Sequence, residues 1–306
     1  MRRAGDHAQE AGRRRTPRAE PGATLGLAAR LALVATLGLG LSACGGGSDR
    51  DATAPAAPSA TATAPRASAA PPAQTDPARP DLPADLDVTF AGVGAKGAWV
   101  LRRAGRRDDA VVLFLHGWTA VAPEQYGPWL THLVREGSTV VYPVYQDAPF
   151  LAPIAAFDGV VAGVRSALDD EDVPRQDWVV AGHSAGGAMS ADYAARAKEL
   201  GLPPARGVFA AYPGRQIRDI PLKLPEADAA RIPASTRLVA LYGANDRTVG
   251  DRTARRTIAR AKTRDEKLVR VDDPAVDDHL GPQRSGSATR RVFWRRLDAL
   301  VRAVRR

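Results

Sequence analysis

The chain has 306 residues and a formal net charge of +9, and its first segment carries much of that excess. Residues 1–43 contain seven arginines against three acidic residues, and the remainder holds 36 basic and 31 acidic side chains. This mild excess does not require a nucleic-acid partner, and no basic-aromatic nucleic-acid motif accompanies it. The only cysteine, Cys44, excludes an internal disulfide and a cysteine-based zinc cluster.

An apolar stretch at residues 31–41 follows Arg30 and is rich in Leu, Ala and Gly. It is too short to span a bilayer as a permanent helix and is typical of the core of an export signal. It runs into Leu-Ser-Ala-Cys at residues 41–44, which resembles the lipobox of bacterial lipoproteins. The resemblance implies that residues 1–43 are a signal peptide, and that acyl chains such as palmitate on Cys44 anchor the protein at the outer face of a bacterial membrane. The alternative is an ordinary secretory signal with a chance cysteine.

The next stretch, residues 44–85, is dominated by Ala, Pro, Thr, Ser and Asp. Such a composition offers too little apolar bulk to offset the entropy of ordering, so we expect a disordered linker. The linker either holds a folded domain away from the lipid surface or is filler without a selected length. Residues 86–306 remain for one folded domain, which is long enough to bury a large core.

The folded domain opens with two segments, 88–90 and 99–103, that predict antiparallel edge strands around a glycine-rich turn. The continuously apolar segment 110–115 predicts a central parallel strand that is buried on both faces. Farther along, we expect strands at 139–144, 178–181, 208–211, 238–242 and 268–271, and helices at 124–136, 154–168, 185–200, 253–261 and 288–304. This alternation predicts an α/β fold with a mostly parallel twisted sheet and helices on both faces.

The segment Gly-His-Ser-Ala-Gly at residues 182–186 stands between an apolar strand and a helix. A sharp turn from strand to helix is the context in which such a serine becomes a nucleophile. The small residues two positions to either side of Ser184 let the strand and the helix approach closely. The alternative is a turn of Gly and Ser without chemical importance.

A serine nucleophile needs a base that takes its proton, and the chain offers five histidines. His279 alone lies in a loop beyond a late strand, where it can reach the carboxyl edge of the sheet. The others lie in the signal (His7), at a strand end (His116), inside a helix (His132) and beside the serine, facing away from it (His183). His279 is therefore the candidate base, and a solvent-exposed loop histidine is the alternative.

The base in turn needs an orienting carboxylate. Asp246 lies in a turn just after the strand 238–242 and is the candidate acid. The alternative role for Asp246 is a turn residue that accepts backbone amides. Its rivals as the acid are Asp251, Asp272, Asp273, Asp277 and Asp278.

The order Ser184, Asp246, His279 is that of the α/β-hydrolase superfamily, and from about residue 88 onward the chain is identified as a member. The spacing Gly-x-x-Asp-x-x-Val at 243–249 is similar to the superfamily's acid loop, and His-Gly at 116–117 matches the strand end of its oxyanion hole. The resemblance implies an oxyanion hole formed by the amides of Trp118 and Ala185. It implies neither a cofactor nor a metal.

The short loops and the elbow resemble dienelactone-hydrolase-like and cutinase-like esterases. Dienelactone hydrolases proper use a cysteine nucleophile, so that activity is not carried over. Only some two dozen residues separate Tyr212 from Thr236, too few for a large helical cap, so we expect an open cleft. Trp118, Tyr145 and Tyr212 each follow a strand end and could wall this cleft; ordinary core packing is the alternative.

The last helix, 288–304, carries apolar residues on one side and arginines on the other. We expect the apolar side to pack on the sheet and the arginine side to face solvent, with anionic lipid headgroups as the alternative contact. The apolar residues are Val292, Phe293, Leu297, Leu300, Val301 and Val304, and the arginines are Arg290, Arg291, Arg295, Arg296, Arg302, Arg305 and Arg306.

These features together predict a membrane-tethered serine hydrolase that cleaves small-molecule or lipid carboxylic esters through an acyl-enzyme. An acyltransferase or a peptidase with the same three residues shares the first half-reaction and stays open as an alternative. A catalytically dead surface binding module is the alternative from another class.

Overall fold

The computed structural model describes residues 77–305 apart from 107–109, 147–154, 171 and 217–222. The predictions for the signal peptide, for Cys44 and for most of the linker therefore fall outside the described residues. Everything described belongs to one compact unit, residues 70–306. None of its described helices combines the length and the apolar character needed to cross a membrane.

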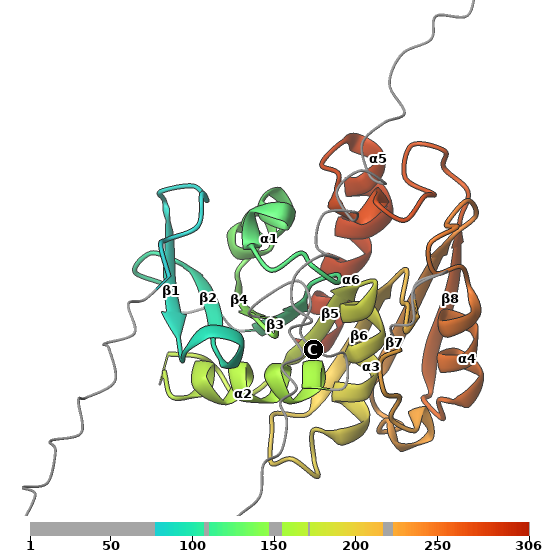
Figure 1. Ribbon diagram of the computed structural model, residues 1–306, viewed down its shortest axis with the longest axis horizontal. Coiled ribbons are helices and arrows are strands. Elements are labelled where there is room, and N and C mark those ends of the chain that lie inside the picture. The colour runs from blue at the N-terminus through green and yellow to red at the C-terminus, as the bar shows by residue number, and fades with distance from the viewer. Residues whose placement is uncertain (1–76, 107–109, 147–154, 171, 217–222, 306) are drawn as a thin grey trace, which may run out of the picture. The chain divides into compact units, whose positions relative to one another are not determined.

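Eight strands form a single sheet in the order β1-β2-β4-β3-β5-β6-β7-β8 (Figure 1). The first two strands pair antiparallel with each other, β2 pairs antiparallel with β4, and all remaining pairs are parallel. The prediction of a mostly parallel sheet with two antiparallel strands at its start is confirmed. The bounds are β1 Leu86–Ala91, β2 Ala98–Arg103, β3 Ala110–Leu115, β4 Ser138–Pro143, β5 Trp178–His183, β6 Ala205–Ala211, β7 Arg237–Gly243 and β8 Asp265–Val271.

Helices cover both faces of this sheet, as predicted (Figure 1). On one face, Trp129 of α1 meets Phe209 of the sheet and Phe293 near the C-terminus at ring distances of 6.2 and 6.1 Å. On the other face, Tyr193 of α3 stacks on Trp178 of β5 at 6.4 Å. Strand β3 is buried along its whole length because it has a strand on each side and helices above and below. The bounds are α1 Gly127–Arg135, α2 Ala156–Leu168, α3 Ala185–Arg196, α4 Arg252–Arg260, α5 Ser287–Thr289 and α6 Arg295–Val304.

Two predicted helices are broken where the sequence predicted continuity. The first divides into a 3₁₀ turn, Pro123–Tyr126, and α1, because Gly127 and Pro128 open a new helix there. The last contains a π-helical segment, Arg290–Trp294, between α5 and α6. Its apolar side is buried as expected, but Arg305, which we expected at the surface, donates a hydrogen bond to the carbonyl of Gly137.

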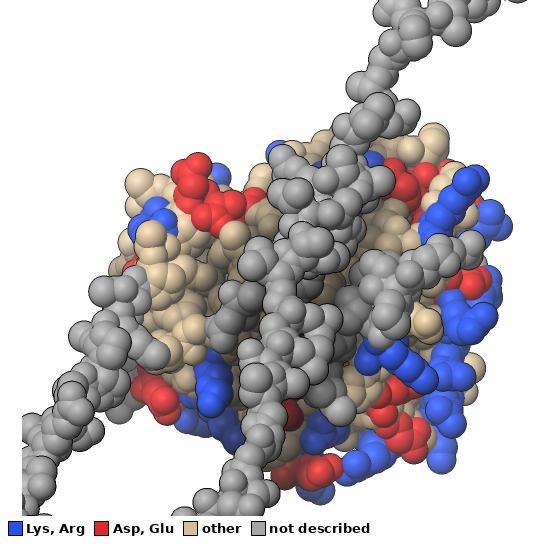
Figure 2. Space-filling view, viewed as in Figure 1, with Lys and Arg blue, Asp and Glu red and all other residues tan. Residues whose placement is uncertain are grey.

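The connection between β6 and β7 contains one short 3₁₀ turn, Ala229–Arg231, among its described residues. The described part of the chain therefore shows no large cap over the sheet, as the short spacing predicted. Helix α4 buries only Ala254 and Thr257 and exposes its arginines. Figure 2 shows basic side chains gathered over this α4 and β8 side of the molecule.

The segment just before β1 belongs to the fold, although the sequence placed it in the linker. Leu82 is buried in the core on the α1 face of the sheet. The Arg79 guanidinium donates to the carbonyls of Leu82 and Pro83 at 3.0 Å each. Composition alone hid this, because a single leucine leaves the Pro-rich and Ala-rich character of the stretch unchanged. The predicted linker therefore extends too far toward the C-terminus.

Replacing Leu82 by alanine tests this anchoring. We expect Leu82→Ala to lower the free energy of unfolding by about 2–3 kcal/mol, because a buried leucine is removed and a cavity remains. Urea unfolding followed by tryptophan fluorescence measures the change. Val93→Ala is the control, because Val93 is 51% exposed and its loss should cost less than about 0.5 kcal/mol. If both substitutions changed the free energy of unfolding equally, the segment around Leu82 would not be part of the folded domain.

Candidate active site

The turn between β5 and α3 holds Ser184 in a backbone conformation that few non-glycine residues adopt. Its φ is 57° and its ψ is −120°, which is a strained region for serine. A Cβ on Gly182 would lie 2.5 Å from the carbonyl carbon of Gly186, and a Cβ on Gly186 would lie 2.0 Å from the carbonyl oxygen of Leu115. Only glycine fits at these two positions, so the elbow motif has a steric cause.

The structure brings Ser184, His279 and Asp246 together, although they come from three distant parts of the chain. Ser184 Oγ lies 3.0 Å from His279 Nε2, and His279 Nδ1 lies 2.8 Å from Asp246 Oδ2. With an ionised Asp246, His279 Nδ1 carries the proton and Nε2 accepts from the serine hydroxyl. The Asp246 side chain is fully buried and that of His279 is 14% exposed.

Backbone amides hold the second oxygen of Asp246. Its Oδ1 accepts from the amides of Thr248 at 2.9 Å and Val249 at 3.1 Å. The alternative role of Asp246 as a turn former is thus combined with its contact to the histidine. Each rival aspartate has a different described partner: Asp251 pairs with Arg255, Asp272 with Arg270, Asp273 with Arg291, Asp277 with Asn245 and Asp278 with Arg284.

The end of β3 lies directly against the elbow. The amide of Gly186 donates to the carbonyl of His116 at 3.0 Å, and a Cβ on Gly117 would lie 3.5 Å from Ser184 Cβ. Ala185 is the first residue of α3, so its amide is one of the groups that a helix leaves unpaired at its start. The assignment of the Trp118 and Ala185 amides to an oxyanion hole stays a prediction.

Two of the three aromatic residues expected to wall the cleft are buried instead. The hydroxyl of Tyr145 donates to the carbonyl of His116, and the tyrosine ring stacks on the His116 imidazole with 3.9 Å between the ring centroids. Tyr212 donates its hydroxyl to the carbonyl of Val276 at 2.7 Å. Both side chains have no exposed surface, so they support loops and cannot touch a substrate. Trp118 is partly exposed, and its role stays a prediction.

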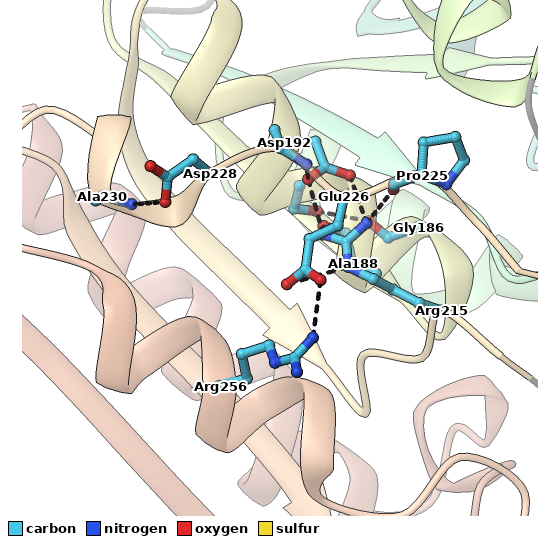
Figure 3. A network of polar contacts seen from close by, with 11 residues as sticks. Gly186, Ala188, Asp192, Arg215, Pro225, Glu226, Asp228, Ala230 and Arg256 are labelled. Carbon is cyan, nitrogen blue, oxygen red and sulfur yellow. Dashed lines mark hydrogen bonds and ion pairs between the residues drawn. The ribbon is translucent and has the colours of Figure 1, made fainter.

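The loop after β6 is fastened to the elbow helix by a buried ion pair (Figure 3). Arg215 donates to both oxygens of Asp192 on α3, at 2.7 and 2.8 Å, and the amide of Ala227 donates to the same carboxylate at 2.9 Å. One residue before Arg215, the amide of Gly214 donates to the carbonyl of Ser184 at 3.0 Å. The ion pair therefore holds in place the segment whose Gly214 amide binds the main chain of Ser184.

Sequence reasoning missed the part played by Tyr126 and His183. The ring of His183 lies 4.9 Å from the ring of His279, and its Nε2 lies 2.9 Å from the carbonyl oxygen of His279. Its Nδ1 lies 2.8 Å from the hydroxyl of Tyr126. No sequence pattern links these residues, because Tyr126 lies in a turn 57 positions before His183.

The arrangement offers a hydroxyl beside a histidine, and that histidine is oriented by a carboxylate. These three side chains can transfer a proton from the serine to a leaving group without a metal ion. Among the described residues, no group of three or more His, Cys, Asp or Glu side chains is placed to hold a metal ion.

Comparisons with known proteins agree with this architecture. A family model described as alpha/beta hydrolase fold matches residues 112–269. No curated protein matches the chain. Among solved structures, a fungal esterase from Rhizomucor miehei is 19% identical with a TM-score of 0.56, and the match covers 74% of this chain and 85% of the esterase.

Two further solved structures show the same similarity. Carboxyl esterase 2 from Tuber melanosporum is 16% identical with a TM-score of 0.58, over 72% of this chain and 89% of the esterase. A provisionally assigned dienelactone hydrolase from Klebsiella pneumoniae is 17% identical with a TM-score of 0.51, over 71% of this chain and 98% of that protein. Identities this low establish a shared fold alone.

Proposed function

The chain belongs to the alpha/beta hydrolase fold family, and we propose that it is a serine hydrolase that cleaves carboxylic esters. The observation that carries this proposal is the continuous contact from Ser184 Oγ through His279 to Asp246, at 3.0 and 2.8 Å. Such an arrangement activates a serine for attack on an acyl carbon. The esterases among its structural neighbours support the choice of esters as substrates.

In the first half-reaction, Ser184 Oγ attacks the ester carbonyl carbon and its proton passes to His279 Nε2. Asp246 stabilises the imidazolium and keeps its ring in place. The amides of Trp118 and Ala185 donate to the oxyanion of the tetrahedral intermediate, and one such donor is worth about 3 kcal/mol of transition-state stabilisation. The intermediate collapses when the carbon–oxygen bond to the alcohol breaks and His279 protonates the departing alkoxide.

In the second half-reaction, water attacks the acyl-enzyme. His279 takes a proton from this water, and the hydroxyl oxygen adds to the acyl carbon. The bond to Ser184 Oγ then breaks, and the proton returns to the serine while the carboxylic acid leaves. Apart from this water, both half-reactions use groups of the chain itself. Trp118 after the end of β3 is the aromatic side chain proposed to contact the substrate.

Reactivity toward a fluorophosphonate probe tests the nucleophile. We expect the probe to label the wild-type protein, and Ser184→Ala to abolish labelling and lower ester hydrolysis at least about 10³-fold, because the attacking oxygen is gone. Ser190→Ala is the matched control: this serine lies in helix α3, which begins directly after Ser184, and its hydroxyl donates to the carbonyl of Gly186 at 2.8 Å. Wild-type protein that resists the probe and hydrolyses no ester would favour a binding module, and a Ser184→Ala variant with full activity would assign the chemistry to another residue.

We also propose that the enzyme is a lipoprotein on the outer face of a bacterial membrane. The support is the sequence Leu-Ser-Ala-Cys at 41–44 after the apolar stretch 31–41, which lies outside the described residues. A single acyl chain gives marginal membrane binding, so stable anchoring needs several chains on one N-terminus. The ester substrates would then be small molecules or lipids available at the cell surface.

The mass of the mature N-terminal peptide tests this location. We expect cleavage before Cys44, acyl chains on that cysteine and recovery of the protein in the membrane fraction. Cys44→Ser should remove the acyl chains and shift the protein out of that fraction, because the cysteine that the lipidation requires is gone. An unmodified Cys44 in the mature protein would rule out lipidation while leaving the hydrolase proposal intact.

A further inference from the structure

The imidazole of His183 lies between the loop that contains His279 and the turn that contains Tyr126. His183 ends β5 directly before Ser184 and is 1% exposed. Its Nε2 lies 2.9 Å from the carbonyl oxygen of His279, and its Nδ1 lies 2.8 Å from the hydroxyl of Tyr126. The Tyr126 hydroxyl in turn accepts from the amide of Gly117 at 3.0 Å.

In this series of hydrogen bonds, the chemistry of the groups decides which one donates and which one accepts. A backbone carbonyl only accepts, so His183 Nε2 must carry the proton and donate to His279. The unprotonated Nδ1 then accepts the Tyr126 hydroxyl proton, which leaves the tyrosine oxygen free to accept from Gly117. Gln283, four residues after His279, adds a longer contact of 3.4 Å from its side-chain amide to the same oxygen. One neutral tautomer of His183 satisfies both of its nitrogens.

The surroundings keep both side chains in this protonation state. Burial, assisted by the nearby His279, lowers the pKa of His183 to about 3. Burial raises the pKa of Tyr126 to about 12. His183 is therefore neutral and Tyr126 protonated at any pH at which esters are normally assayed. A protonated His183 would direct an N–H at the tyrosine oxygen and displace the hydroxyl proton from its acceptor.

We infer that His183 is a positioning residue that links the segment after β3, which carries the proposed oxyanion amide of Trp118, to the loop that carries the proposed base. The inference rests on the proposed hydrolase function. The hydrogen bond to the Gly117 amide restrains the His116–Gly117 peptide, which directly precedes the peptide that carries the Trp118 N–H. The hydrogen bond to the His279 carbonyl restrains the base from its main chain, while Asp246 restrains its ring. Both hydrogen bonds therefore fix their segments relative to His183, the residue directly before the nucleophile.

A purely structural histidine would fill the same volume without affecting the reaction. A positioning role and a purely structural role predict different effects on kcat. Neither role predicts a change in KM, because His183 is buried and does not contact the substrate. Loss of positioning lowers the rate of the chemical step, since a displacement of about 1 Å at a reacting group can cost about 10²-fold. Substrate binding stays nearly unchanged.

Two substitutions separate these possibilities. His183→Phe keeps a ring but removes both hydrogen bonds, and we expect kcat to fall about 10- to 100-fold with KM within about twofold. His183→Gln supplies an oxygen acceptor and an N–H donor on one planar group, so it should recover most of the lost rate. His132→Phe is the matched control: His132 contacts Asp298 at 3.0 Å and stacks on Trp294, away from the site. It should leave kcat unchanged even if it lowers stability.

Nitrogen-15 NMR of the wild-type histidines gives a readout that does not depend on any variant folding. We expect His183 to show the neutral Nε2–H tautomer from pH 5 to pH 9 without titrating. Titration of His183 near its ordinary value, or an Nδ1–H tautomer, would overturn the inference, as would a folded His183→Phe protein with wild-type kcat. If the wild-type protein hydrolyses no ester, the proposed function fails, whereas the tautomer still reports whether the hydrogen-bonded chain exists.

Discussion

The close approach of helix α3 to strands β3 and β5 is the constraint on which the rest of the site depends. It is possible because Gly182 and Gly186 have no side chain, and any Cβ at Gly186 would overlap the β3 backbone. The same contact joins the amide of Gly186 to the carbonyl of His116. The turn is thereby forced to carry Ser184 at a positive φ, above the first amide of the helix. The strain at one serine is thus maintained by the packing of three elements.

A second close approach brings the base to the serine. A Cβ on Gly243 at the end of β7 would lie 2.1 Å from the carbonyl oxygen of Asp277, so this glycine lets the loop that contains His279 lie on the acid loop. The amide of Asn245 donates to the same Asp277 carbonyl at 3.1 Å. The spacing of glycine and aspartate in the acid loop therefore reflects packing between two loops as well as the position of one carboxylate.

Most of the architecture could be predicted from the sequence because it is encoded locally. The apolar segment 110–115 predicts the buried strand that the structure shows, and glycines two positions from Ser184 predict the turn. Chain order and loop position were enough to select His279 and Asp246, which the structure places in contact. These signals lie within single elements or in the order of elements.

Features that depend on contacts between elements could not be predicted in this way. An aromatic residue after a strand has the same sequence pattern whether it lines a cleft or supports a loop, and Tyr145 and Tyr212 proved to be buried. The partners of His183 lie in a 3₁₀ turn and in a late loop, so no local pattern announces them. Leu82 was missed for a related reason, because a single buried side chain does not alter the composition of a Pro-rich segment enough to be noticed.

Trapping the covalent intermediate is the most direct test of the account. The wild-type protein would be mixed rapidly with p-nitrophenyl acetate, quenched in acid at successive times and digested for peptide mass analysis. The account predicts an initial release of p-nitrophenol of about one equivalent per site, together with an acetyl group on the peptide at Ser184. Acetyl transfer to another side chain on the pathway, or turnover without any acetylated enzyme, would contradict it.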